Sequence, residues 1–391
     1  MRAIGVITGS RSDYGVYLPL LRAISADPTF TLHLLATGTH LSPEFGMTIN
    51  EIEADGFRVA ERVEALLSSD TPESIGKSMG LGTIGFAQVF ARSRPDILVV
   101  LGDRFEMHAA ALAALPYNIP VAHIHGGEIT EGAFDNALRH SLTQLSHLHF
   151  VATEEYGQRV IQMGSEPWRV TVSGALSLDN VRTIKLLNRG ELEARVGLSF
   201  ARPPILVTFH PVTLEYEDTE WHVSELMAAL QVVDLPIVFT MSNADTNGRS
   251  ITEKMKEFVR QRPSACLVDN LGTQAYFSLM AQAAVMVGNS SSGIIEAMSF
   301  ELPVVNIGTR QTGRIRPQNV IDVGYGCGEI VAALRHALEP EARSRLRGHA
   351  NLYGDGCAAN RIVAKLKEVP LDSRLLRKRL SAAGKENQLS P

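Results

Sequence analysis

Short, wholly apolar segments alternate along the chain with segments whose apolar residues recur at helical spacing. In the first half, the segments with strand character are Ile4–Thr8, Thr31–Ala36, Ile97–Leu101, Val121–His125, His149–Ala152 and Val170–Val172. The helical patterns between them cover Leu18–Ser25, Pro72–Ser93, Phe105–Leu115, Asp135–Ser146 and Tyr156–Met163. Strands that are apolar throughout are buried on both faces, so this half predicts a parallel sheet covered by helices.

The second half repeats the alternation. Its strand segments are Ile205–Phe209, Ile237–Thr240, Ala265–Val268, Val285–Val287 and Val304–Ile307, and its helical patterns are Trp221–Leu230, Ile251–Val259, Thr273–Gln282, Gly293–Ser299 and Ile330–Leu338. We place the boundary near Asn180–Phe200, where a polar, charged helix precedes Arg202-Pro203-Pro204. The chain is therefore predicted to hold two α/β domains with doubly wound parallel sheets, at 1–185 and 186–370, and a C-terminal tail at 371–391.

Composition narrows the class of protein. The chain has 391 residues, of which 45% are hydrophobic and 20% charged, so two globular domains can each bury a core and disorder is excluded. The net charge of -5 leaves no general basic surface for nucleic acid, and the basic run Arg374–Arg379 is expected to be a solvated helix face. With no apolar run of about 18 residues and no signal-peptide pattern, we expect a soluble, cytoplasmic protein without membrane contact.

Cofactor and metal motifs are missing from the sequence. The three cysteines have no paired spacing, and no Cys/His cluster favours zinc. The first strand leads into a polar loop with Arg11 and Asp13 instead of the dinucleotide fingerprint GxGxxG, and the chain has no Walker motif. We therefore expect no metal and no bound cofactor.

Ionisable residues follow the strands of the first half, where a parallel sheet binds its ligands. Asp103 and Arg104 come after Gly102, and Asp13 follows the first strand. Helix capping is the alternative reading for Asp13 and Asp103. The stretch His123–His140 holds three carboxylates, three histidines and one arginine, which is more charge than an idle surface needs.

The strand ends of the second half favour an anion. Gly288-Asn289-Ser290-Ser291-Ser292-Gly293 opens a helix, where small residues expose backbone N–H groups to a phosphate. Glu296 lies one turn into that helix, where a carboxylate can accept hydrogen bonds from a ribose diol. Other polar residues directly after strands are His210, Asn243, Arg249, Arg310, Arg314 and Arg316. Arginine offers a planar fork of donors that suits phosphate oxygens.

Together these motifs resemble the hydrolysing UDP-N-acetylglucosamine 2-epimerases of sialic and legionaminic acid synthesis. The motifs are Gly102-Asp103-Arg104, His123-Ile124-His125-Gly126-Gly127-Glu128, Asp135…Arg139-His140, Phe209-His210-Pro211, Gly288-Asn289-Ser290-Ser291-Ser292-Gly293 and Gly308-Thr309-Arg310-Gln311, in order over roughly residues 1–370. The resemblance implies the GT-B architecture, in which two Rossmann-like domains enclose the active site in the cleft between them. It also implies a C-terminal helix, here Ala358–Val369, that crosses back to the first domain.

The resemblance also implies a reaction and roles for residues. A UDP-linked 2-acetamido sugar loses its C2 proton and UDP, and water then adds to the 2-acetamidoglucal, so that UDP-N-acetylglucosamine gives UDP and N-acetylmannosamine. Asp103 and Asp135 match catalytic carboxylates of the family. Nucleotide-contacting positions match Arg11, His210, Asn243, Arg249, Ser290, Ser291, Glu296 and Arg310. We add Asp13, Arg104 and Arg314 to the substrate-binding set, and His125, Glu128 and His210 to the catalytic candidates.

One departure leaves the proton-transfer group open. Some relatives have Glu where His125 stands, so His125 or Glu128 would take the C2 proton if neither aspartate does. This variant looks closer to the bacterial branch that acts on sialic or legionaminic acid precursors.

Several alternatives stay open. They are UDP-N,N′-diacetylbacillosamine as the sugar, guanine in place of uracil, a GT-B glycosyltransferase, and a non-catalytic nucleotide-sugar sensor. Relatives are often oligomers, so a homodimer or homotetramer is expected.

Overall fold

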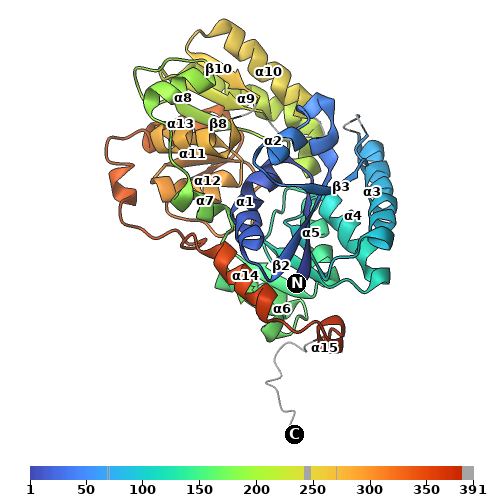
Figure 1. Cartoon of the computed structure of the whole chain (residues 1–391). Helices are drawn as coiled ribbons and strands as arrows, with labels where there is room; N and C mark the ends of the chain where they lie inside the picture. Colours follow the sequence, from blue (N-terminus) through green and yellow to red (C-terminus); the bar gives the residue numbers. More distant parts are fainter. Residues whose placement is uncertain (68, 70, 242–247, 270, 381–391) are drawn as a thin grey trace.

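The computed structural model describes residues 1–67, 69, 71–241, 248–269 and 271–380, except for the side chain of Arg249. Its strands form two separate sheets, and in each sheet all neighbouring strands run parallel. Figure 1 shows one sheet and its helices above the other. This is the two-domain α/β architecture that the sequence predicts.

The first sheet has seven strands in the order β3-β2-β1-β4-β5-β6-β7. Their bounds are β1 (Arg2–Thr8), β2 (Phe30–Thr37), β3 (Val59–Val63), β4 (Ile97–Leu101), β5 (Val121–Ile124), β6 (Leu148–Val151) and β7 (Val170–Val172). The central strand β4 is buried throughout: Ile97 and Val99 face one hydrophobic core, while Leu98 and Val100 face another. This alternation requires helices on both faces of the sheet.

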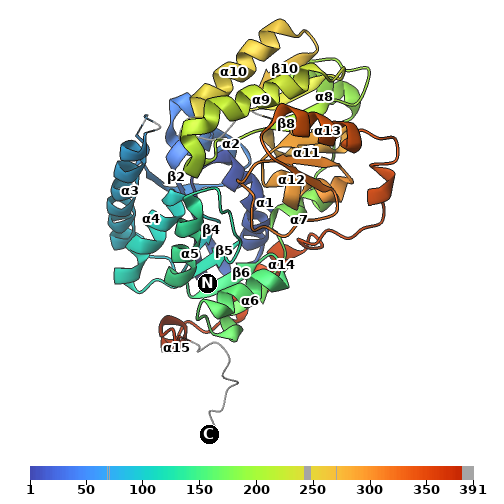
Figure 2. The ribbon, with the colours of Figure 1, turned by 180° about the vertical axis from the view of Figure 1, so that it is seen from behind.

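Helices of the first domain supply those two cores. The core on one face includes α1 (Arg11–Ala26), and the core on the other face includes α3 (Pro72–Arg92), α4 (Phe105–Ala114) and α5 (Asp135–Leu145). Figure 2 shows α3, α4 and α5 side by side. The remaining helices of this half are α2 (Ile49–Ala54), α6 (Glu154–Gln162) and α7 (Ser177–Thr183).

The second sheet has six strands in the order β10-β9-β8-β11-β12-β13. Their bounds are β8 (Ile205–Thr208), β9 (Ile237–Thr240), β10 (Ala265–Val268), β11 (Val285–Gly288), β12 (Val304–Ile307) and β13 (Val320–Val323). One face packs on α9 (Thr219–Gln231), α10 (Gly248–Gln261) and α13 (Cys327–Ala337). The other face packs on α8 (Arg189–Val196) and α11 (Gly272–Gln282), while the short α12 (Ser292–Ile295) follows β11.

Short 3₁₀ segments fill several connections. They are η1 (Gly38–Leu41), η2 (Pro43–Phe45), η3 (Leu115–Tyr117), η4 (Pro167–Arg169), η5 (Thr213–Asp218), η6 (Ala297–Phe300) and η7 (Ser344–Leu346). The expected helix at Gly293–Ser299 is thus divided into α12 and η6.

The C-terminal part of the chain returns to the first domain. Helix α14 (Ala358–Glu368) packs against α1, and Ile362 and Leu366 are buried in the first domain's core. The single turn α15 (Ser373–Leu376) is held by Arg169, whose guanidinium donates to the carbonyl of Leu375 at 2.8 Å. The expected crossing helix is confirmed, while the domain boundary at 185/186 stays a prediction.

Other differences from the sequence-based expectation include two strands, the short helix α2 and the start of one helix. The unpredicted strands β3 and β13 are both at sheet edges, and polar residues interrupt their apolar pattern, as with Glu61 and Asp322. Helix α1 begins at Arg11 instead of Leu18, and Ser10 caps it by accepting from the backbone N–H of Asp13. Asp13 and Asp103 therefore do not act as helix caps, since the residue preceding α4 is Arg104.

Helix α14 depends on a side chain from α7. The carboxylate of Asp179 accepts from the backbone N–H groups of Ala358 and Ala359, each at 2.8 Å. Asp179→Ala should lower the free energy of unfolding by about 1–3 kcal/mol, because two donors at the start of α14 lose their partner. Denaturant melts measure this loss. Asp218→Ala is the control, since Asp218 precedes α9 without a capping hydrogen bond. Equal stability of the two variants would contradict the capping role.

Candidate active site

A cavity of about 1080 Å³ lies where the carboxyl ends of the two sheets face each other. Residues of both domains line it. Among the predicted site residues, those at its wall are Arg11, Asp13, Asp103, Arg104, Asp135, His210, Ser290, Ser291, Glu296, Arg310 and Arg314. Asn243 lies outside the described residues, as does the side chain of Arg249. The structure thus brings most of the predicted residues to one space between the domains.

Two carboxylates of the first domain reach the cavity from neighbouring loops. Asp103 follows β4 directly after Gly102, whose φ of +69° turns the chain at the strand end. Asp135 is the first residue of α5. Because both side chains line the cavity, a ligand can meet two carboxylates at this end.

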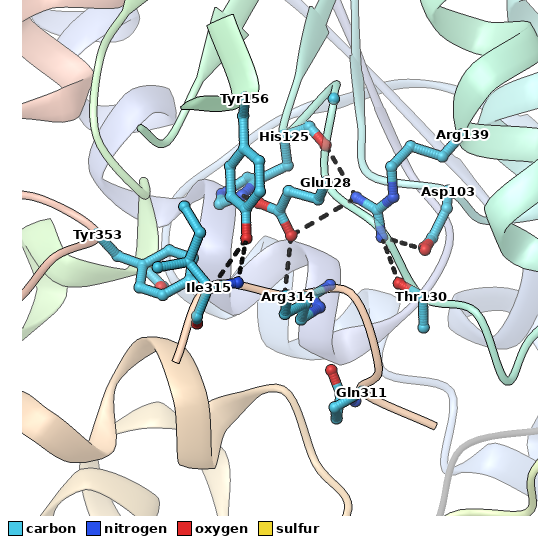
Figure 3. A network of polar contacts seen from close by, with 12 residues as sticks. Asp103, His125, Glu128, Thr130, Arg139, Tyr156, Gln311, Arg314, Ile315 and Tyr353 are labelled. Atoms are coloured by element: carbon cyan, nitrogen blue, oxygen red, sulfur yellow. Dashed lines mark hydrogen bonds and ion pairs between the residues drawn. The ribbon is translucent and has the colours of Figure 1, made fainter. Parts of the chain in front are cut away.

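Arg139 of α5 forms hydrogen bonds with two of the catalytic candidates. Its guanidinium donates to the carboxylate of Asp103 and, at 2.8 Å, to the backbone carbonyl of His125 (Figure 3). The side chain is almost completely buried. Arg139 is absent from the predicted site residues, although its position one α-helical turn after Asp135 signals that both reach the same end of the sheet.

Glu128 and His125 lie behind the cavity wall. The Nδ1 atom of His125 is 2.5 Å from one carboxylate oxygen of Glu128, and Arg314 is 2.8 Å from the other. Burial opposes ionisation of Glu128, but Arg314, His125 and Arg139 outweigh it and hold the pKa of this carboxyl below its usual range. Neither His125 nor Glu128 lines the cavity.

A second charged group follows β1. Asp13 is buried, which raises its pKa to about 6, while nearby Arg104 opposes the shift. Arg104 donates to both carboxylate oxygens of the buried Glu106, at 3.2 and 2.9 Å. Glu106 is also absent from the predicted site residues, because nothing in the sequence shows that it turns back beneath the loop after β1.

Residues after β8, β11 and β12 form the second domain's wall. The buried side chain of Asn289 accepts from the backbone N–H of His210 at 2.7 Å and donates to its carbonyl at 2.8 Å. Arg310 and Gln311 in turn donate to the backbone carbonyl of Asn289, at 3.2 and 2.8 Å. Burial and the charge of Arg310 lower the pKa of His210 well below its usual value, so its imidazole is neutral.

Gly288 lets these loops approach each other. Its φ is +134°, and a Cβ atom there would lie 2.0 Å from the carbonyl oxygen of Thr208. No side chain fits this position, so the glycine of the sequence motif is a packing requirement of neighbouring strand ends.

Glu296 connects the second domain to the start of α7. One carboxylate oxygen accepts from the hydroxyl of Ser177, and the other is buried without a hydrogen-bond partner among the described residues. Burial raises the pKa of Glu296 to about 7, although the Ser177 hydrogen bond opposes the shift. A buried acceptor without a partner is suited to a ligand hydroxyl.

Arg11 also connects the two domains, since its guanidinium donates to the carbonyl of Asp269 at 3.5 Å.

Within the described part of the chain, no three His, Cys, Asp or Glu side chains lie close enough together to hold a metal ion. The same part of the chain contains no helix with the length and apolar character to cross a membrane.

The sequence is similar to those of known enzymes. The profile of the family described as UDP-N-acetylglucosamine 2-epimerase matches residues 22–367. The GDP/UDP-N,N′-diacetylbacillosamine 2-epimerase (hydrolyzing) of Campylobacter jejuni is 40% identical over 82% of this chain and 84% of its own. The UDP-N,N′-diacetylbacillosamine 2-epimerase (hydrolyzing) of Legionella pneumophila is 38% identical over 97% of this chain and 99% of its own.

The fold is also that of a solved structure. The crystal structure of UDP-GlcNAc 2-epimerase from Neisseria meningitidis bound to UDP-GlcNAc superimposes with a TM-score of 0.80 at 19% identity, over 94% of this chain and all of that chain. This likeness supports the GT-B-like arrangement of two parallel-sheet domains. The profile match covers most of the sequence, and the two bacterial relatives align along most of both chains. The chain therefore belongs to the UDP-N-acetylglucosamine 2-epimerase family of enzymes.

Proposed function

We propose that this enzyme is a hydrolysing 2-epimerase that converts UDP-N-acetylglucosamine to UDP and N-acetylmannosamine. The observation that carries the proposal is a single cavity whose first-domain wall has Asp103 and Asp135 and whose second-domain wall has Arg310 with Ser290 and Ser291. Carboxylates on one side suit proton transfer at the sugar, and donors on the other suit a diphosphate leaving group.

A second substrate is favoured by the relatives. The Campylobacter and Legionella proteins, at 40% and 38% identity, are both named for N,N′-diacetylbacillosamine linked to a nucleotide. The Campylobacter name also includes GDP, so both the sugar and the base of the substrate, uracil or guanine, have to be determined. The reaction at C1 and C2 is the same for either sugar.

The oligomeric state, a homodimer or homotetramer, and a cytoplasmic location stay predictions from the sequence.

The proposed chemistry begins with loss of the C2 proton. That hydrogen has no neighbouring carbonyl and is barely acidic, so its removal must accompany the departure of UDP. The C–H electron pair forms the C1=C2 double bond while the C1–O bond breaks and leaves its electrons on the diphosphate. Water then adds its hydroxyl to C1, and a proton reaches C2 from the opposite face. Asp103 and Asp135 are our choice for these proton transfers because, unlike Glu128 and His125, they line the cavity.

The nucleotide would occupy the second domain's side. Arg310 carries a positive charge near the neutral His210, and both line the cavity, so they can stabilise charge on the leaving diphosphate. The unpartnered oxygen of Glu296 is our candidate acceptor for the ribose hydroxyls.

The reaction type is tested by proton NMR in deuterated water, with UDP-N-acetylglucosamine and UDP-N,N′-diacetylbacillosamine supplied separately. One of them should release free UDP and a sugar with inverted C2 configuration and deuterium at C2, because the proton added to the glucal comes from solvent. An intact, epimerised UDP-sugar would instead indicate the non-hydrolysing reaction. Transfer to an added acceptor would identify a glycosyltransferase, and binding without turnover a sensor.

The carboxylates are tested by Asp103→Asn and Asp135→Asn. Each variant should bind UDP like the wild type but lose turnover by about 10²–10⁴-fold, the usual contribution of general acid–base catalysis. Asn keeps an oxygen to which Arg139 can donate in the first variant. The exposed Asp234→Asn is the control for the substitution itself. Near-normal turnover in both site variants would transfer the proton-handling role to His125 or Glu128.

The pH dependence of UDP binding tests Glu296. With a pKa of about 7, its carboxylate is ionised above neutral pH and takes up a proton as the pH falls. If the ionised form accepts the ribose hydroxyls, UDP affinity should weaken below pH 7 by at most about tenfold per pH unit, since one proton must be released on binding. Calorimetric titrations of the wild type and of Glu296→Gln between pH 6 and pH 8 measure this. UDP itself titrates equally in both, so parallel curves would contradict the role.

A further inference from the structure

Two loops from different domains meet at the wall of the cavity. The first-domain loop at 126–135 contacts the second-domain loop at 308–316, where the backbone N–H of Glu131 donates to the carbonyl of Thr312 at 3.3 Å. A Cβ atom on Gly313 would lie 2.3 Å from Ile129, and one on Gly132 would lie 2.8 Å from the Cα atom of Arg310. Gly132 thus packs against the backbone of the opposite loop and Gly313 against the side chain of Ile129, so neither glycine has space for a side chain.

The ion pair between Glu128 and Arg314 lies in this contact. The two charged groups are 2.8 Å apart, and their side chains are 1% and 6% exposed. Charges buried this deeply are costly to separate, because removing one partner leaves the other unpaired in a medium of low polarity. The pair thus fixes the relative position of the two loops more strictly than an apolar contact of the same size.

Each end of the ion pair leads to one half of the proposed site. On the first-domain side, Arg139 lies 3.8 Å from Glu128 and donates to the carboxylate of Asp103 (Figure 3). The loop of Glu128 ends where α5 begins, at Asp135. On the second-domain side, the loop of Arg314 carries Arg310 and Gln311, which hold the carbonyl of Asn289.

A pair of tyrosines supports the same contact. The hydroxyl of Tyr156 accepts from the backbone N–H of Ile315 at 3.1 Å, and the hydroxyl of Tyr353 donates to the carbonyl of Ile315 at 2.9 Å. The residue after Arg314 is thereby held by side chains that lie outside the cavity. Both polar groups of the Ile315 backbone are therefore held next to Arg314.

We propose that Glu128 and Arg314 are positioning residues, and that their ion pair sets the carboxylates of the first domain at the correct place relative to the nucleotide site of the second. The proposal rests on the function proposed above. It assigns neither residue a proton transfer or a direct nucleotide contact. Its distinctive consequence is that a first-domain carboxylate outside the cavity controls binding of a nucleotide in the second domain.

The test compares Glu128→Gln, Arg314→Gln and the double variant by UDP calorimetry and by steady-state turnover. Each single variant should weaken UDP binding by about tenfold or more and lower kcat. Glu128→Gln leaves the buried Arg314 without its carboxylate, and Arg314→Gln leaves Glu128 paired only with His125 and Arg139 of its own domain, so each change removes the ion pair between the loops. The double variant removes both charges together, so its UDP affinity should return to within about threefold of the wild type and its kcat should exceed that of either single variant.

A control at another ion pair separates this effect from the general loss of a carboxylate partner of a buried arginine. Glu166 is 2.8 Å from the buried Arg169, and neither residue lines the cavity. Glu166→Gln should lower the melting temperature without changing UDP affinity or kcat. The melting temperatures of all variants show whether each is folded under the assay conditions.

Other results would overturn the proposal. If Arg314→Gln weakens UDP binding and Glu128→Gln does not, Arg314 is a nucleotide contact. If the double variant recovers UDP affinity but not turnover, Glu128 is a proton-transfer group. A wild type that binds no UDP would overturn the proposed function and this inference together. If the wild type binds UDP but the losses of affinity in the two single variants simply add in the double variant, only the inference is overturned.

Discussion

The parallel direction of every strand in both sheets determines where chemistry can occur in this protein. Parallel pairing brings the carboxyl ends of neighbouring strands to one edge, and the loops that leave that edge carry the polar residues. Asp103, Asp135, His210 and Arg310 are far apart in sequence but follow strands β4, β5, β8 and β12. Because the two edges face each other, one cavity can join a set of carboxylates to a set of donors.

Much of this arrangement is readable from the sequence. Wholly apolar strands separated by helical patterns specify a parallel sheet, and the residues after each strand then fall at the ligand-binding edge. The edge strands β3 and β13 escaped prediction because an edge strand is only partly buried, and Glu61 and Asp322 break its apolar run. Periodicity therefore predicts the centre of each sheet better than its borders.

The partners of the site residues were beyond the reach of sequence patterns. Arg314 follows a strand and carries a positive charge, so its position indicates a phosphate contact. In the structure it lines the cavity and also pairs with the carboxylate of Glu128, which the sequence does not indicate. Arg139 is a similar case, since it reaches Asp103 only through the packing of α5 beside the loop after β4, whereas Glu106 contacts Arg104 two residues away. The sequence pattern places a charged residue at the carboxyl edge of a sheet, but it does not show which residue of opposite charge lies next to it in the folded protein.

The return of α14 to the first domain has a consequence for how the chain is made. Helix α1 is synthesised near the start, but the helix that covers part of its apolar face is encoded at residues 358–368, more than three hundred residues later. During translation the first domain emerges with part of α1 lacking this cover, while the whole second domain is still to come. The first domain is thus completed only after the second domain has been made, and closing that long loop adds a slow, entropically costly step to folding.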